Sequence, residues 1–399
     1  MSGPINWISQ IASITKFGLL SIPQRVGSVG AALFGVAGVV GVLVGVLSMA
    51  VGFKKAMASS ATPDSAIVLR SGAEDEMSSG LERDVTRLIA DAPGLARGPE
   101  GPMASAELFV IINLPKRSTL TDANVPMRGV EQAAFHVREK FKLLKGRLFE
   151  GGKNEVIVGV GAAQEFAGLD VGNKIKLGRN QWDVVGIFSA GGGSAESEIW
   201  TDATVLQGAY HRGNSFQSVY ARLTAPDAFF QFSNSIATDP RMNVKPIRQT
   251  EYYAGKSTVL TTLINTLGFL VASLMAIGAV FAALNTMYNS VSTRTREIAT
   301  LRALGFGGGA VIIAVMVESL AISLIGGAIG AVIAYLAFNG FHTATVNWQT
   351  FSQVTFAFAV TPQLLVLGII WATFIGLIGG LFPAVRAARL PIAAALREL

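Results

Sequence analysis

The side chains that most often carry out enzymatic chemistry are few and scattered in this chain. Its three histidines are His136, His211 and His342, and no His-Glu-x-x-His or Gly-x-Ser-x-Gly pattern is present. The absence of cysteine excludes a thiolate nucleophile, a thiolate metal site and disulfide bonds. Glu196 and Glu198 stand close together, but no histidine or further carboxylate accompanies them at ligand spacing. The sequence therefore predicts no catalytic residue and no metal site.

One short segment resembles a phosphate-binding loop. Gly255-Lys256-Ser257-Thr258 matches the end of the Gly-x-x-x-x-Gly-Lys-Ser/Thr pattern, but Thr250 stands where its first glycine is required. That glycine lets the backbone wrap closely around the phosphates, so its replacement removes the site. We therefore expect no nucleotide-binding site in this chain.

The charged residues are concentrated in the middle of the sequence. Of 399 residues, 51% are hydrophobic and 15% are charged, whereas soluble globular proteins carry about 25% charged residues. Residues 54–256 hold 23 of the 26 acidic and 24 of the 32 basic side chains, so this region has the composition of a water-soluble domain. Its charges nearly cancel, and the other cations flank apolar segments. We therefore expect no nucleic-acid partner.

Long uncharged segments predict membrane spans. Residues 26–53 and 257–293 contain no charged side chain, and residues 319–385 contain none apart from His342. A span needs about 20 apolar residues, so the last segment is long enough for two spans, which the polar stretch after Asn339 divides. We expect an α-helical membrane protein with four transmembrane helices, at 28–52, 257–293 (a stalk and a span), 310–338 and 363–384.

The remaining segments form one large domain and four short pieces. A large α+β extracytoplasmic (periplasmic) domain, of two lobes, is expected at 53–256, between the first and second spans. The short pieces are an interfacial helix within 1–27, a charged segment at 294–309, a short outer loop at 339–362 and a C-terminal segment at 385–399. The first apolar segment is too long for a cleavable signal, so we expect it to remain as a span.

The short loops predict the orientation of the chain. In a four-span protein the N-terminus, residues 294–309 and the C-terminus share one side of the bilayer. These segments carry eight Lys or Arg residues and two Glu residues, which places them in the cytoplasm. The large domain then lies outside, which in a bacterial cell is the periplasm or the cell surface, and we expect a multi-pass protein of the bacterial inner membrane.

Apolar and β-branched runs predict the elements of the large domain. Strands are expected at 66–70, 106–114, 124–130, 155–159, 174–178, 182–188 and 216–223, and helices at 79–91, 160–167 and 226–237. The run from Arg138 to Arg147 has five cations in ten residues. We interpret it as a solvated strand or loop face, with a contact to anionic lipid or a partner protein as the alternative. The glycines at 191–193 predict a flexible loop.

The segment after the second span has the most specific pattern. It matches Arg-x-Arg-Glu-Ile-x-x-Leu-Arg-Ala-x-Gly at Arg294, Arg296, Glu297, Ile298, Leu301, Arg302, Ala303 and Gly305. Glu318 with the following Gly326-Gly327, the stretch from Val184 to Asp202, and the C-terminal pattern from Pro383 fit the same family. In these features, and in its one-plus-three arrangement of spans, the chain resembles the FtsX/MacB-like family of ABC transporter permeases, here without a fused ATPase domain.

This resemblance implies that 294–309 is a coupling segment. Its contacts to a separate ABC ATPase subunit would be made by Arg294, Arg296, Glu297, Leu301, Arg302 and Gly305. That subunit would bind ATP and Mg²⁺, and this chain would have no cofactor and no enzyme activity of its own. The alternative is that these cations only set the orientation. Further implied partners are a second permease copy, in a homodimer or heterodimer, and a periplasmic adaptor (membrane fusion protein) with an outer-membrane channel.

Glu318 is an ionisable residue inside the third span and therefore a candidate functional group. Because it lies about two turns from the start of that span, we expect it to pair with the coupling-segment arginines; a proton or substrate site is the alternative. A further cytoplasmic contact is expected at Pro383, Arg386 and Arg389.

The resemblance implies that the chain couples ATP hydrolysis to a conformational change of its periplasmic domain, which drives efflux from the periplasm or inner membrane. One alternative is a permease that extracts lipoproteins or lipids. The other is an FtsX-like regulator that signals to periplasmic enzymes and moves no substrate.

Overall fold

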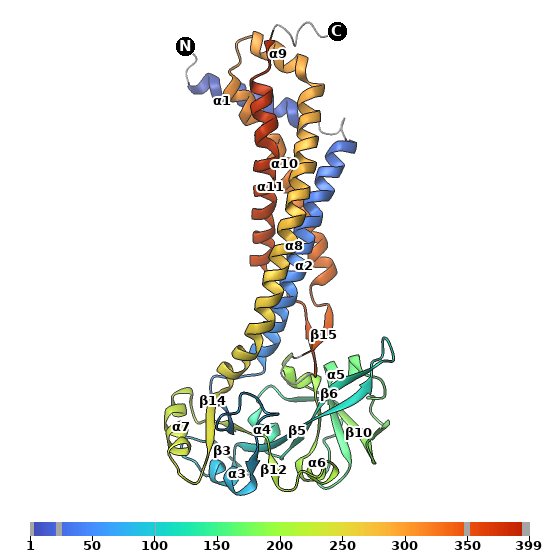
Figure 1. Cartoon of the computed structure of the whole chain (residues 1–399), viewed down its shortest axis with the longest axis vertical. Helices are drawn as coiled ribbons and strands as arrows, with labels where there is room; N and C mark the ends of the chain where they lie inside the picture. The colour runs from blue at the N-terminus through green and yellow to red at the C-terminus, as the bar shows by residue number, and fades with distance from the viewer. Residues whose placement is uncertain (1–3, 21–25, 100, 347–351, 393–399) are drawn as a thin grey trace. The chain divides into compact units, whose positions relative to one another are not determined.

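The structure, a computed structural model, describes residues 4–20, 26–99, 101–346 and 352–392 (Figure 1). These residues form two compact units. The helical unit comprises the described residues of Met1–Val51, Thr262–Phe341 and Phe358–Leu399. The mixed unit comprises those of Gly52–Thr261 and His342–Ala357.

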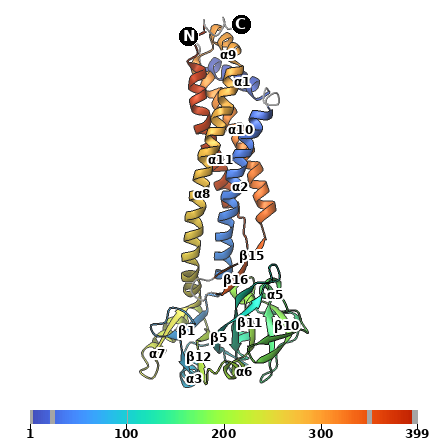
Figure 2. The same ribbon diagram turned by 45° about the vertical axis from the view of Figure 1, so that its right-hand side comes forward.

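Four helices in the described ranges are long and apolar enough to cross a membrane. They are α2 (Val26–Ser59), α8 (Gln249–Thr293), α10 (Gly308–Phe338) and α11 (Pro362–Ala388). Two shorter helices accompany them, α1 (Pro4–Leu20) and α9 (Thr295–Ala303), the latter between α8 and α10. The prediction of four apolar helices around a mixed domain is confirmed. Helix α8 is a single helix of 45 residues, drawn without a break in Figure 2. At 1.5 Å per residue this is about 68 Å, more than twice the hydrocarbon thickness of a bilayer.

Glycines bring the helices of the helical unit close together. A methyl group added at Gly330 of α10 would collide with the backbone of Ala37 in α2, and one at Gly326 would lie 3.0 Å from the carbonyl oxygen of Leu33. A methyl group at Gly376 of α11 would lie 2.7 Å from the hydroxyl of Ser323. These small-residue positions therefore serve helix packing within one chain.

The mixed unit is built on one ten-stranded sheet. Its order is β14 (Val244–Arg248), β1 (Ser65–Arg70), β13 (Ser218–Arg222), β5 (Ala104–Pro115), β6 (Asp122–Val130), β11 (Ile199–Asp202), β8 (Glu155–Gly159), β10 (Asn180–Ser189) and β7 (Lys142–Gly146), with β9 (Lys174–Leu177) also paired to β10. The pairs β6–β11 and β8–β10 are parallel and the others antiparallel.

The long strand β5 joins two halves of this sheet. Its residues Ala104–Glu107 pair with β13, and Leu108–Pro115 pair with β6. The half with β13, β1 and β14 has a core with α3 (Arg83–Ala90) and α7 (Phe229–Ala237). The half with β6, β8 and β10 has a separate core with α5 (Val160–Glu165) and α6 (Ala203–Ala209). The two expected lobes are thus two halves of a continuous sheet.

The remaining elements are short. They are β2 (Leu81–Glu82), β3 (Arg97–Gly98), β4 (Gly101–Pro102), α4 (Ala134–Val137), η2 (Ser194–Ser197), β12 (Ser215–Phe216), η3 (Pro226–Ala228), β15 (His342–Val346) and β16 (Gln353–Ala357).

The sequence-based elements of the mixed unit are mostly confirmed, with three corrections. The helix expected at 79–91 begins only at Arg83, because Leu81 and Glu82 pair with β12. The strand expected at 216–223 is interrupted at Gln217, whose side chain instead accepts a hydrogen bond from Phe109 N at 3.0 Å. The loop expected at 339–362 contains the β15–β16 hairpin, which belongs to the mixed unit.

Candidate functional site

The predicted coupling segment contains the short helix α9. Its apolar residues Ile298 and Ala299 are buried, and Ile298 belongs to a core with Ile14 of α1 and Val311 of α10. Gly305 ends the helix with φ at +93°, a left-handed conformation that suits glycine. The buried residues Ile298 and Ala299 therefore fix one face of α9 against its neighbours, and Gly305 ends the helix.

Arg294 forms an ion pair with the buried Glu318 at the start of this segment. Arg294 Nη1 lies 3.4 Å from Glu318 Oε2, and its Nε donates to Glu297 Oε2 at 3.1 Å. Ser290 of α8 donates to Glu318 Oε1 at 3.1 Å. The structure thus places Glu318 beside a coupling-segment arginine and joins α8, α9 and α10 at one point.

Helix α1 also reaches this ion pair. A methyl group added at Gly18 would lie 3.0 Å from Glu318 Oε2 and 3.5 Å from Arg294 Nη1. Because Gly18 has no side chain, α1 packs directly against this ion pair.

The C-terminal site residues have different environments. Arg302 Nη1 donates to the carbonyl oxygen of Leu390 at 2.8 Å, which ties α9 to the residues after α11. The guanidinium of Arg386 lies 5.5 Å from the ring centre of Tyr288. Arg389 is exposed, but Pro383 is buried inside α11. Pro383 is therefore a packing residue in this structure and not part of an accessible contact surface.

The exposed face of the coupling segment is charged and borders an apolar hollow. Arg296 and Glu297 are exposed, and no ion pair of Arg296 occurs among the described residues. Beside them is a hollow of about 420 Å³. It is lined by Ser13, Ile14, Glu297, Thr300, Leu301 and Phe306. A charged helix beside an apolar recess is suited to contact with another protein.

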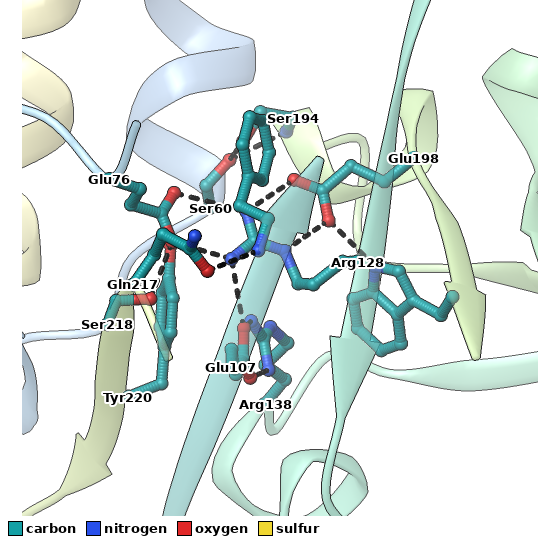
Figure 3. A network of polar contacts seen from close by, with 12 residues as sticks. Ser60, Glu76, Glu107, Arg128, Arg138, Ser194, Glu198, Gln217, Ser218 and Tyr220 are labelled. Carbon is teal, nitrogen blue, oxygen red and sulfur yellow. Dashed lines mark hydrogen bonds and ion pairs between the residues drawn. The ribbon is translucent and has the colours of Figure 1, made fainter. Parts of the chain in front are cut away.

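A second polar cluster lies inside the mixed unit and was not predicted (Figure 3). We call it the Arg128 node. Arg128 of β6 bonds to Glu76 through Nη1 at 2.6 Å, to Glu107 through Nη1 at 3.0 Å, and to Glu198 through Nε at 2.7 Å. All four side chains are at least 92% buried. The three carboxylates come from the loop after β1, from β5, and from the start of β11, so the node connects both halves of the sheet.

A second arginine completes the node. Arg138 makes a bidentate ion pair with Glu107, at 2.6 and 2.7 Å. Its guanidinium also lies 4.3 Å from the ring centre of Tyr220 and 4.7 Å from that of Trp200. Arg138 was expected on a solvated face, and this expectation is wrong, because its charge is needed to balance a buried carboxylate. The strand Lys142–Gly146 is exposed, as expected.

The charges of the node are mutually stabilised. Burial raises the pKa of Glu76, but the charge and hydrogen bonds of Arg128, with a contribution from Lys256, outweigh it and lower this pKa to about 2. Burial alone would lower the pKa of Arg128, but the charges of Glu198 and Glu76 outweigh this effect and raise the pKa well above its usual value. Glu76 and Arg128 are therefore charged at neutral pH.

Sequence reasoning missed the node because its members are far apart in the chain. The available signal was a set of isolated charges inside apolar strands, Glu107 in β5 and Arg128 in β6. Buried charges need partners, so these two positions predict an ion pair but not its other members. In the described ranges the structure also contains no cluster of metal-ligating side chains.

Known protein families match both units. The FtsX-like permease C-terminal family matches residues 269–392, and the MacB-like periplasmic core domain matches residues 30–238, which is more than half of the chain. MacB of Pasteurella multocida, a macrolide export ATP-binding/permease protein, is 25% identical over 322 residues, covering 72% of this chain and 45% of the relative. MacB 1/2 of Paracoccus denitrificans is 27% identical over 348 residues, covering 81% and 49%.

The chain spans about half the length of these MacB relatives. Among solved structures, the periplasmic region of MacB from Actinobacillus actinomycetemcomitans is similar, with 9% identity and a TM-score of 0.36, covering 49% of this chain and 93% of that one. The family matches cover the mixed unit and the membrane helices together. The chain therefore belongs to the FtsX/MacB-like family of ABC transporter permeases.

Proposed function

We propose that this chain is the permease subunit of an ABC transporter that lies in the bacterial inner membrane. A separate ATPase subunit hydrolyses ATP in the cytoplasm, and the permease converts this into a conformational change of its periplasmic mixed unit. The termini and α9 lie in the cytoplasm, because the short loops on that side carry eight cations against two carboxylates.

The geometry of α9 is the observation that carries this proposal. Its buried face is fixed by Ile298, and Arg294 is fixed by Glu318, while Arg296 and Glu297 remain accessible. A helix fixed to its neighbours in this way passes a push from a partner on to α8 and α10. ATP and Mg²⁺ bind to the ATPase subunit, since this sequence has no complete phosphate-binding loop.

A second permease copy packs against α8. In the helical unit this helix exposes large apolar side chains at a spacing of three and four residues: Leu263, Leu267, Leu270, Leu274, Ile277 and Phe281. This spacing matches the seam between two long helices that pack against each other. These six residues lie within a wider exposed apolar face of α8, and in this proposal lipid covers the rest of that face.

The transport direction is outward, and the MacB relatives named as macrolide exporters support this choice. A periplasmic adaptor and an outer-membrane channel complete the assembly in this proposal. Whether this chain handles a macrolide is tested by comparing the macrolide susceptibility of cells with and without it.

Tagged purification of the full chain in mild detergent, followed by mass spectrometry, tests the assembly. The proposal predicts recovery of an ABC ATPase subunit together with a periplasmic adaptor. An ATPase recovered with lipoprotein instead of an adaptor would change the assignment to extraction. Absence of any ATPase, even after crosslinking in cells, would contradict the proposal.

A further inference from the structure

Three parts of the mixed unit converge on the short segment Ser194–Glu198, which consists of η2 and the residue after it. We call it the relay segment. Its neighbours are the end of α2, the β15–β16 hairpin and the Arg128 node. In the sequence the hairpin lies between α10 and α11, so two of these neighbours continue directly into apolar helices.

The end of α2 holds the first residue of the relay segment. Ser194 N donates to Ser60 Oγ at 2.7 Å, and the two hydroxyl oxygens are 3.0 Å apart (Figure 3). A methyl group added at the preceding Gly193 would lie 2.7 Å from Ser60 Oγ. The contact is therefore close as well as hydrogen-bonded.

The hairpin holds the fourth residue. Thr355 N donates to Ser197 Oγ at 2.8 Å, and Ser197 Oγ lies 2.9 Å from Thr355 Oγ1. A side chain at Gly161 would collide with Thr355, so no larger residue fits beside this contact. Phe356 of the hairpin also packs edge-on against Phe53 of α2, at 5.4 Å between ring centres.

The last residue of the relay segment belongs to the Arg128 node. Glu198 accepts hydrogen bonds from Arg128 at 2.7 and 2.8 Å, and a further one from Trp200 Nε1 at 2.7 Å. Between the two serines, Glu196 accepts bonds from the backbone N–H groups of Ala190 and Gly192, at 2.7 and 2.8 Å. The Gly191–Gly193 loop, expected to be flexible, is thus fastened to the relay segment.

The first turns of α8 reach the node from a different direction. The hydroxyl oxygens of Tyr253 and Tyr220 are 3.3 Å apart, and the Tyr220 ring centre lies 5.3 Å from the guanidinium of Arg128. The segment after α2, the β15–β16 hairpin and the start of α8 therefore each contact either the relay segment or the node itself.

We propose that the relay segment transmits movement of α2 and the β15–β16 hairpin to the Arg128 node, and so to both halves of the sheet. A displacement of Ser194 or Ser197 shifts Glu198, which is connected to them by the backbone of a single short helix. Glu198 holds Arg128, which in turn holds Glu76 in the loop after β1 and Glu107 of β5. This inference rests on the proposed function, because it assumes that ATP hydrolysis moves the apolar helices.

A reversible crosslink tests the relay directly. Since the chain has no cysteine, the double variant Ser197→Cys/Thr355→Cys introduces the only thiols, at positions whose side-chain oxygens are 2.9 Å apart. We expect the reduced variant, which lacks both hydroxyls of this contact, to stimulate the partner ATPase in liposomes less than the parent, and the disulfide formed on oxidation to restore the stimulation. The matched control Asn113→Cys/Asn124→Cys joins β5 and β6, which already face each other in register, and should leave stimulation unchanged.

Three results distinguish a failure of the relay from a failure of the proposed function. Equal stimulation by the reduced and oxidised forms, or no crosslink at all, would overturn the relay while the proposed function stands in the cysteine-free parent. A parent chain that stimulates no ATPase would overturn both.

The conservative substitutions Thr355→Ser and Thr355→Val provide a second measurement that does not depend on disulfide formation. Thr355→Ser keeps the hydroxyl that contacts Ser197 and should retain the stimulation of the ATPase. Thr355→Val removes this hydroxyl and should reduce the stimulation at equal amounts of folded protein. Equal stimulation by both variants and the parent would contradict the relay.

Discussion

At the scale of single residues, buried carboxylates at two places in the described residues are neutralised by a partner from a distant segment. Glu318 faces Arg294 in the helical unit, and Arg128 faces three carboxylates in the mixed unit. A buried ion pair adds little net stability over an apolar core, but losing one partner is expensive, at about 3–5 kcal/mol. Such pairs therefore fix where elements meet more than they stabilise the fold.

The Arg294–Glu318 pair predicts energetic coupling between these two positions. Glu318→Gln and Arg294→Gln should each destabilise the helical unit, and the double variant should cost less than the sum, by about 1–3 kcal/mol. Unfolding of the full chain in detergent, followed for all three variants, gives this coupling energy. Arg296→Gln is the control, because Arg296 is exposed on the same helix and should combine additively with Glu318→Gln. Additive effects for Arg294 would show that the pair is not formed.

The low pKa of Glu76 predicts a loss of stability in acid. A carboxyl group whose pKa falls from 4.5 to about 2 on folding stabilises the folded state above pH 4.5, and this stabilisation is lost as the pH falls toward 2. The contribution is about 3 kcal/mol. Urea unfolding of the full chain, followed by tryptophan fluorescence near the node, should show a steeper pH dependence in the parent than in Glu76→Gln. The exposed Glu74→Gln is the control and should behave as the parent. Equal slopes for Glu76→Gln and the parent would contradict the assignment.

At the scale of elements, the structure separates what a local pattern can predict from what it cannot. The strand at 155–159 and the helix near 229–237 follow from β-branched and apolar runs, and the four long helices follow from uncharged segments. Pairing between distant segments leaves no such pattern. Leu81 and Glu82 were assigned to a helix because their strand partner, β12, lies more than 130 residues away.

In the candidate site, too, features with a local sequence pattern were predictable and contacts between distant segments were not. The coupling segment was predicted from a charged motif between two apolar spans that resembles the permease family, and its pairing with Glu318 followed from the position of Glu318 about two turns into the next span. Its contact with Leu390 left no such signal. Arg138 was misplaced because its sequence neighbours are exposed cations, while its partner Glu107 is 31 positions away. The β15–β16 hairpin was missed because its short strands lie in a polar stretch between apolar helices.

Gly305 predicts that the end of α9 is sensitive to substitution. With φ at +93°, Gly305→Ala should strain the left-handed turn that ends the helix, at a cost of about 1 kcal/mol, and should weaken the stimulation of the ATPase. Gly309→Ala is the matched control, because Gly309 is helical and an added methyl group there meets open space. Thermal unfolding and ATPase assays on both variants measure the difference. Equal behaviour of the two variants would mean that the turn does not position α9.

At the scale of the whole molecule, each unit has its own connection between elements. In the helical unit α9 gathers α8, α10 and the residues after α11, through Glu318 and Leu390. In the mixed unit the relay segment and the Arg128 node gather the end of α2, the start of α8 and the hairpin. The force transmission proposed for this chain requires such a fixed point within each unit.

The most direct test of the account is the ATPase rate of the partner subunit with and without this chain in liposomes. The account predicts that the parent chain and Arg179→Ala, a control on the β9–β10 turn, stimulate the rate equally. It predicts that Arg296→Ala, on the exposed face of α9, loses both association and stimulation while it folds normally. Full association and stimulation by Arg296→Ala, or no effect of the parent chain, would contradict the coupling role of α9.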